Sequence, residues 1–178
     1  VEEPDKDALC HGGVLAEIRQ VVRVPQKGIR VMVYGEKRAI LREFREANGF
    51  WEGDISIYPE KCPDLPEGVT LEGMKKVLTD ALKQYAIRTK RVPEGVIQDI
   101  LKIDDVYTMA AEAAAGIGLD SASLQKLLDE DSLLERFYLL AAKIEEETRA
   151  FDITAEIEKK VRERIDRGQR EYILREQL

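Results

Sequence analysis

The sequence is poor in the residues from which many compact functional sites are built. Its 178 residues contain two cysteines, Cys10 and Cys62, and a single histidine, His11. Two cysteines without a CxxC pair supply neither a disulfide framework nor the ligand set of a structural zinc site. We therefore expect no metal site in this chain.

Signals for membranes, nucleotides and catalysis are also missing. No apolar run reaches the roughly 18 residues of a membrane span, and no secretory leader opens the sequence. There is no G-x-x-x-x-G-K-[ST] phosphate loop, and the serines have no lysine or histidine partner at a suggestive spacing. We expect a cytoplasmic chain with no catalytic residue, no cofactor of its own and no membrane partner.

Positive charge is in deficit. The chain has 28 Lys and Arg against 35 Asp and Glu, which gives a net charge of −7. Phosphate groups are bound by a positive field, so this balance argues against a protein that coats nucleic acid or an anionic membrane. Nucleic acid is not indicated as a partner, whereas 44% hydrophobic residues are enough for an ordinary core.

Residues 1–68 have the alternating pattern of β-strands. Apolar residues are expected to point one way at every second position of the first strand, namely Val14, Ala16, Ile18, Val22 and Val24. Further strands are expected at 29–34, 37–47 and 50–58, and Asn48-Gly49 supplies a strong hairpin turn signal between the last two. This predicts four antiparallel strands with one apolar face and exposed edges, which an additional segment or a second copy should cover.

Helical spacing follows a proline-rich stretch at residues 59–68, which we interpret as a linker. Helices are expected from residue 70 to about 85, from 93 to 101, from 104 to 115 and from 120 to 128. We divide the chain into a β subdomain (1–68), a helical subdomain (69–130) and a final helix (131–178).

The last 48 residues contain no proline and one glycine, Gly168, so they are predicted to form a single helix. At 1.5 Å per residue that helix is about 70 Å long, whereas a compact chain of this size is about 40 Å across. We expect the helix to protrude and the chain to be a piece of a larger protein. The fold class is α+β: an antiparallel sheet followed by an α-helical bundle that ends in one long protruding helix.

Several stretches resemble the N-terminal domain of the Lon family of ATP-dependent serine proteases. Residues 13–18 are similar to a G-T-V-A-x-I motif of that domain, and residues 30–39 read R-V-x-V-x-G-x-x-R-A. Residues 100–105, 133–136 and 169–178 resemble the helical part that follows it, in the same order along the chain.

The resemblance implies a PUA-like sheet, here partial, and a role in recognising substrates and in assembly. The parent protein is then expected to be a hexamer that degrades misfolded and regulatory proteins with ATP and Mg²⁺, through catalytic residues outside this chain. Unfolded or damaged proteins are the expected partners, and the chain alone is expected to form a homo-oligomer, such as a dimer or a strand-swapped form.

Three groups of residues are candidates for these roles. The aromatic pair Phe50 and Trp51 follows the Asn48-Gly49 turn and is a candidate for contact with substrate. The alternative is that Trp51 closes a small β core. Around the first hairpin, Val24, Pro25, Ile29 and Met32 are candidate substrate contacts, against the alternative of a plain exposed turn. On the final helix, a narrow apolar row is the candidate oligomerisation surface: Ile153, Ile157, Val161 and Ile165.

A different class of protein is the alternative. A free-standing PUA-like protein that binds RNA or a small ligand would share the sheet, but the acidic charge argues against RNA.

Overall fold

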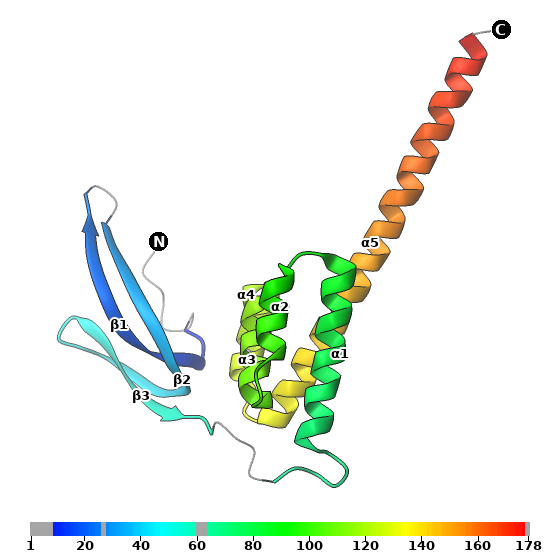
Figure 1. Cartoon of the computed structure of the whole chain (residues 1–178). Coiled ribbons are helices and arrows are strands. Elements are labelled where there is room, and N and C mark those ends of the chain that lie inside the picture. Colours follow the sequence, from blue (N-terminus) through cyan, green and yellow to red (C-terminus); the bar gives the residue numbers. More distant parts are fainter. Residues whose placement is uncertain (1–8, 26–27, 60–63, 177–178) are drawn as a thin grey trace. The chain divides into compact units, whose positions relative to one another are not determined.

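The computed structural model describes residues 9–25, 28–59 and 64–176 (Figure 1). Contacts divide the chain into two compact units. The β unit comprises Val1–Pro66 and Leu119–Tyr138, and the helical unit comprises Glu67–Gly118 and Leu139–Leu178. This grouping places residues 119–130 with the sheet, whereas the sequence analysis groups them with the helices. The three-part division stays a prediction.

The sheet has three antiparallel strands in the order β1-β2-β3. They are β1 (Gly12–Val24), β2 (Gly28–Ala47) and β3 (Phe50–Ile57). The predicted four strands are wrong, because 29–34 and 37–47 belong to one strand, β2. Ala16 pairs with Gly35 and Leu15 pairs with Lys37, so Glu36 is accommodated as a bulge and does not end the strand.

The predicted turn between β2 and β3 is confirmed. Asn48 and Gly49 have φ angles of 54° and 80°, as a two-residue turn of the I′ kind requires. Of the predicted linker at 59–68, residues 60–63 lie outside the described residues. Residues 64–70 contain no helix or strand.

A short helix is part of the β unit. In α4 (Ser121–Asp129), the side chain of the N-cap residue Asp120 accepts a hydrogen bond from the Ser123 amide, as the sequence predicts. The Gly12 amide of β1 donates to Asp129 Oδ1 at 2.9 Å, and Gln125 Nε2 donates to the Gly12 carbonyl at 2.8 Å. These bonds fix α4 to the first residue of the sheet.

A bundle of helices forms the helical unit: α1 (Leu71–Thr89), α2 (Glu94–Leu101), α3 (Val106–Gly116) and the part of α5 from Leu139 onward. Its largest fully buried side chains are Leu78, Leu82, Tyr85, Met109 and Ile144. The Tyr85 hydroxyl donates to the Ile117 carbonyl at 3.0 Å, so this buried polar group is satisfied.

The long final helix is confirmed: α5 runs without interruption over Leu133–Glu176. Within the helical unit, Arg91 pairs with Glu147 at 3.6 Å and Arg88 with Asp152 at 3.2 Å. From Ile153 onward every side chain of α5 that the structure describes is exposed. No helix in the described part of the chain is both long and apolar enough to cross a membrane.

Candidate functional site

The most extensive exposed apolar surface of the β unit lies on the ribbon that β1 and β2 form beyond the bulge at Glu36. We call residues 16–24 of β1 and 28–35 of β2 the apolar arm. Val21 pairs with Val31, and Ile18 pairs with Val33, so these four side chains point to the same face of the ribbon. Ile29, two residues before Val31, shares that face.

This arrangement depends on a second bulge. Ile18 pairs with Val33 and Gln20 pairs with Met32, so Arg19 is the extra residue of β1. The bulge shifts the alternation by one residue, which places Ile18 and Val21 together. The prediction that Ile18, Val22 and Val24 share a face is therefore wrong, because strict alternation does not allow for an inserted residue.

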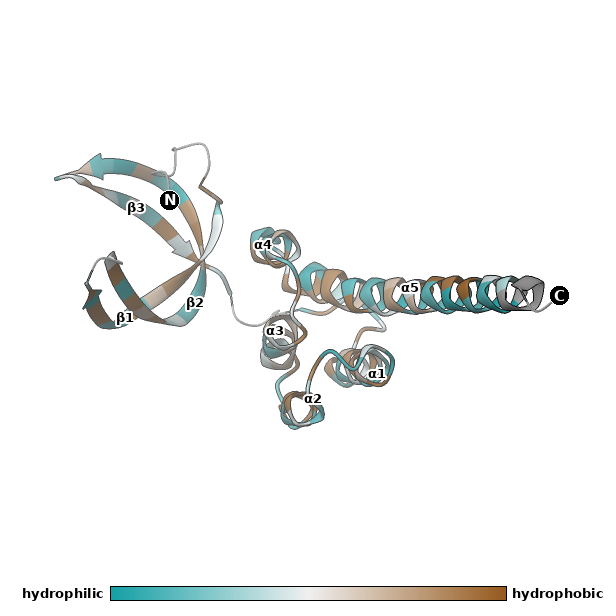
Figure 2. Ribbon diagram, turned by 90° about the horizontal axis from the view of Figure 1, so that it is seen from above, coloured by the Kyte–Doolittle hydropathy of each residue, from teal (hydrophilic) through white to brown (hydrophobic). Residues whose placement is uncertain are grey.

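All the apolar side chains of this face are exposed. Their exposed fractions lie between 46% and 64%. We call the group the arm face, and its members are Ile18, Val21, Ile29, Val31 and Val33. Figure 2 shows hydrophobic residues along β1 and β2. Contiguous exposed apolar surface of this kind is typical of interaction sites.

The arm also has unpaired edges. β3 pairs with β2 only from Ala39 to Ala47, so the preceding part of β2 has β1 on one side and no described strand on the other. The outer edge of β1 likewise has no partner among the described strands. Free N–H and C=O groups along such edges can pair with an extended segment of another chain.

The charged side chains of the arm are mostly basic. Arg19 pairs with Glu17 at 2.8 Å and lies over the ring of Tyr34, 5.2 Å from its centroid. Arg23 and Arg30 are exposed. The arm therefore combines aliphatic side chains with positive charge, in a chain whose net charge is negative.

The residues predicted around the first hairpin do not form one cluster. Ile29 belongs to the arm face, whereas Val24 and Met32 lie on the opposite face. Val24 is half-buried, and Pro25 is exposed at the turn. The sequence analysis missed Val21, Val31 and Val33 as site residues, and the period-two spacing of Val31 and Val33 was the signal that could have found them.

The second candidate, Phe50 and Trp51, adjoins the opposite end of β2. Trp51 is 51% exposed, so the prediction that it closes a small core is wrong. Its ring packs at a tilt against Phe44, with 5.2 Å between centroids. Phe50 points to the other face of β3 and is also exposed. The two aromatic residues therefore present apolar surface on both faces of this hairpin.

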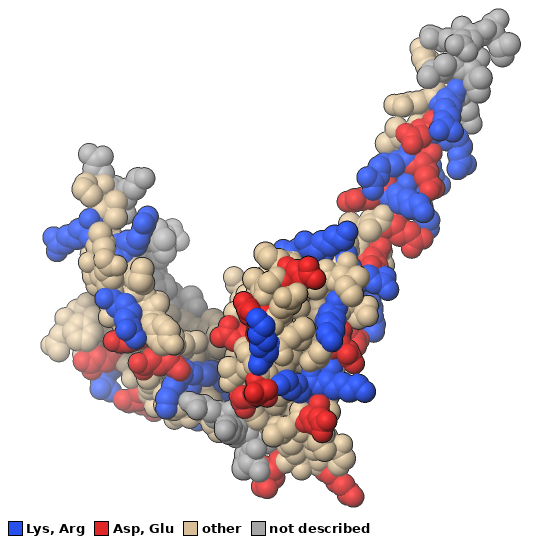
Figure 3. Space-filling view, in the orientation of Figure 1, with Lys and Arg blue, Asp and Glu red and all other residues tan. Residues whose placement is uncertain are grey.

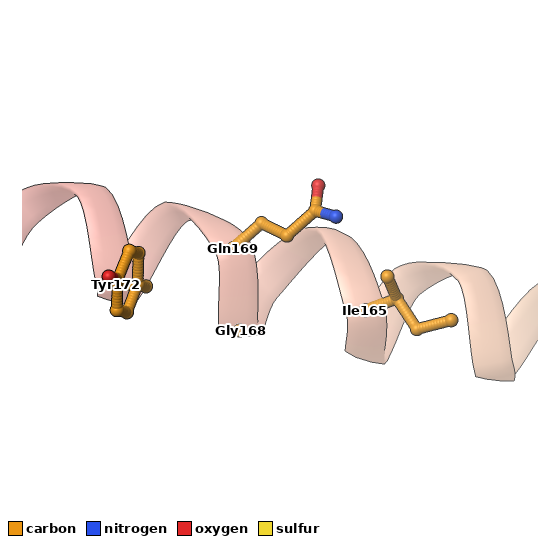
Figure 4. A pocket seen from close by; sticks show the side chains of 4 residues that line it. All are labelled: Ile165, Gly168, Gln169 and Tyr172. Carbon is orange, nitrogen blue, oxygen red and sulfur yellow. The ribbon is translucent and has the colours of Figure 1, made fainter.

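The third candidate, the apolar row on α5, is continuous. Figure 4 shows Ile165, Gly168, Gln169 and Tyr172 around a shallow hollow on the helix, where the glycine leaves room between the two larger apolar side chains. Tyr172, which the sequence analysis missed, extends the row. We call the set the α5 seam: Ile153, Ile157, Val161, Ile165 and Tyr172. The rest of this part of the helix carries interspersed acidic and basic side chains (Figure 3).

A polar cluster that the sequence analysis did not find holds the β unit together. The Arg38 guanidinium lies 3.7 Å from the centroid of the Tyr58 ring and donates to the carbonyls of Leu128 and Glu130. The Tyr58 hydroxyl donates to Asp131 Oδ1 at 2.6 Å. Burial and this hydrogen bond raise the pKa of Tyr58, and burial lowers the pKa of Arg38. Tyr58 is therefore a neutral donor at physiological pH, which suits a structural role.

Metal binding has no support in the described part of the chain. No group of three or more His, Cys, Asp or Glu side chains is positioned there to hold an ion.

The chain is similar to known proteins over most of its length. Residues 1–146 match the family model of the ATP-dependent protease La (LON) substrate-binding domain. Two relatives named Lon protease are similar over nearly the whole chain. The one from Desulfovibrio desulfuricans is 27% identical over 99% of this chain and 20% of its own length. The one from Porphyromonas gingivalis is 28% identical over 100% of this chain and 21% of its own length.

A solved structure shares the fold. The N-terminal domain of Mycobacterium avium complex Lon protease matches with a TM-score of 0.58 and 22% identity, over 79% of this chain and 73% of that one. The chain thus spans about a fifth of the length of the relatives that it matches in sequence.

Proposed function

Because the chain belongs to the family of ATP-dependent protease La (LON) substrate-binding domains, we propose that it captures unfolded or damaged proteins for an ATP-dependent serine protease. The observation that carries this proposal is the arm face, a row of exposed aliphatic side chains beside unpaired strand edges. The protease activity, with ATP and Mg²⁺ as cofactors, is part of the proposal for the whole protein.

The arm suits a client that has lost its fold. An unfolded chain exposes aliphatic and aromatic side chains together with backbone N–H and C=O groups. The arm face can contact the side chains, and the strand edges can pair with the backbone. Neither contact demands a particular sequence, so clients of many kinds are accepted.

Further contacts complete the proposed surface. Val24, Pro25 and Met32 supply apolar contacts at the turn and on the reverse face of the arm, and Phe50 and Trp51 supply aromatic contacts at the other hairpin. Each contact is weak, as suits a client that a motor must later pull away. Several copies in one assembly raise the overall affinity without new contacts.

Assembly is the second proposed role. The side chains of the α5 seam are exposed and do not belong to the hydrophobic core of the helical unit. We propose that the seam packs against the same helix of another copy in a homo-oligomer. In the whole protein, this homo-oligomer is a hexamer. Its charged surroundings and the hollow at Gly168 support this proposal, because a neighbouring side chain can insert beside a glycine. The alternative of an RNA-binding or ligand-binding PUA-like protein is not favoured by the comparisons.

Binding of a carboxymethylated, permanently unfolded protein to residues 1–178 tests the first role. The double variant Ile29→Thr, Val31→Thr should bind it about tenfold more weakly, since each change removes apolar surface. The matched control is Ile87→Thr, Val77→Thr, because these side chains are comparably exposed on α1. Equal affinity of the two double variants would contradict the role of the arm face.

A further inference from the structure

A groove between α2 and α3 is the strongest feature of the helical unit that the proposed function leaves unused. The two helices lie side by side in both ribbon views (Figures 1 and 2). The groove has a volume of about 450 Å³, within the usual range for ligand sites. Its lining comprises Val96, Asp99, Ile100, Ile103, Thr108, Glu112, Ala115 and Gly116.

Small residues on α3 keep the groove open. A Cβ atom at Gly116 would lie 2.9 Å from Ile100 Cδ1, so the two helices approach closely at this end. Ala115, which is exposed, leaves space above that contact. The floor is therefore apolar, and Val96, itself 39% exposed, forms one wall.

The rim is acidic. The charged residues among those that line the groove are two carboxylates, Asp99 and Glu112. Asp99 is paired with Lys102 at 2.8 Å, and Asp104 with Lys75 at 3.1 Å. Glu112, in contrast, makes no ion pair with any residue that the structure describes. Its charge is uncompensated directly beside the apolar floor.

An occupant that suits both the floor and the rim carries an apolar side chain next to a cationic one. The apolar side chain would exclude water from Val96 and Ile103, and the cation would pair with Glu112. An acidic segment would place like charges together, which disfavours binding. Thr108 Oγ1 donates to Asp105 Oδ2 at 2.7 Å, so its lone pairs remain able to accept a hydrogen bond from the occupant.

We propose that this groove binds protein segments in which an aliphatic or aromatic residue adjoins lysine or arginine. The inference rests on the proposed function and gives it a substrate class: basic, partly apolar segments of client proteins. The groove then complements the arm, whose charged residues are mostly basic.

Two labelled ten-residue peptides with the same leucines test this proposal on residues 1–178 by fluorescence anisotropy. Lysine flanks each leucine in one peptide, and glutamate does so in the other. The lysine peptide should bind more tightly. Glu112→Lys should weaken its binding about tenfold, because an attraction becomes a repulsion. The matched control Glu163→Lys, on the exposed part of α5, should change the affinity by less than about twofold.

Ala115→Leu provides a second variant, because it narrows the groove without changing charge and should also weaken the lysine peptide. Circular dichroism confirms that each variant is folded. The proposal is overturned if the glutamate peptide binds equally well, or if Glu112→Lys and Glu163→Lys behave alike. If this test fails while the unfolded client still binds through the arm, the proposal for the groove is wrong and the proposed function still stands. If the unchanged chain binds no client at all, the proposed function is wrong as well.

Discussion

At the scale of single residues, Gly12 lies where an added side chain would clash with backbone as well as side-chain atoms. A Cβ atom there would lie 2.5 Å from Asp129 Oδ1 and 2.8 Å from the Leu128 carbonyl oxygen. Gly13, its neighbour, has nothing within 4 Å of its Cβ position. An added methyl group is therefore expected to clash at Gly12 but not at Gly13.

Gly12→Ala should lower the free energy of unfolding by about 2 kcal/mol, because α4 must move away from the start of β1. Gly13→Ala is the matched control and should change it by less than about 0.5 kcal/mol. Urea unfolding followed by tryptophan fluorescence measures both values. A Gly12→Ala variant as stable as Gly13→Ala would contradict the contact between β1 and α4.

Tyr58 gives a prediction about pH. Tyr58→Phe removes the hydrogen bond to Asp131 and should lower the free energy of unfolding by about 1 kcal/mol at pH 7. The pKa of Tyr58 is raised in the folded protein, so folding favours the neutral phenol. That advantage is complete below the ordinary tyrosine pKa of about 10 and is lost as the pH rises through the folded value.

The difference in the free energy of unfolding between the unchanged protein and Tyr58→Phe should therefore stay constant from pH 7 to 9 and decrease above about pH 10. Tyr138→Phe is the control, because Tyr138 lies in the β unit and its hydroxyl makes no hydrogen bond with any residue that the structure describes. A difference that grows with pH would show that the ionised form is favoured instead.

At the scale of helices and strands, the α5 seam predicts self-association. Ile157→Ser, Val161→Ser should raise the dissociation constant of the homo-oligomer at least about tenfold, because it removes two large apolar side chains from the contact. Ala155→Ser, Lys159→Ser alters the opposite side of the same helix turns and should have little effect. Sedimentation at several concentrations measures both, and a chain that remains monomeric throughout contradicts the proposed contact.

The helices were predictable because their signals are local. Asp120 caps α4, Gly116 and Gly118 follow the apolar run of α3, and the absence of proline allows α5 to continue. The α5 row was predictable for the same reason, since Ile153 to Ile165 recur every four residues.

The strands were less predictable because bulges carry little sequence signal. Gly35-Glu36 has the composition of a turn, yet it is absorbed within β2. Nothing in the type of Arg19 indicates that it lacks a pairing partner, and without that fact the members of the arm face cannot be identified. The cluster of Arg38, Tyr58 and Asp131 joins residues far apart in the sequence, which no local pattern encodes.

At the scale of the whole molecule, the two units differ in the size of their cores. In the described part of the β unit, the buried hydrophobic residues are Ala39, Tyr58, Leu127, Leu134 and Phe137. Only Ala39 comes from within a strand. The helical unit contains the larger share of the buried apolar side chains, including all the most deeply buried ones.

We therefore expect the β unit to unfold first. Trp51 is the one tryptophan of the sequence and lies in the β unit, so its fluorescence reports on that unit, whereas circular dichroism at 222 nm reports mainly on the helices. The fluorescence midpoint in urea should fall below the circular dichroism midpoint. Coincident transitions would mean that the units unfold together.

The bulge at Arg19 also makes the length of the arm tolerant of change. β1 has one residue more than its partner requires at that point, so a deletion of the Arg19 codon would leave Ile18 opposite Val33 and Gln20 opposite Met32. Both faces of the ribbon would keep their apolar side chains, and the loss would be limited to the ion pair of Arg19 with Glu17 and its contact with the Tyr34 ring. An in-frame loss of one amino acid, which inverts an ordinary strand, would here leave the arm face in place.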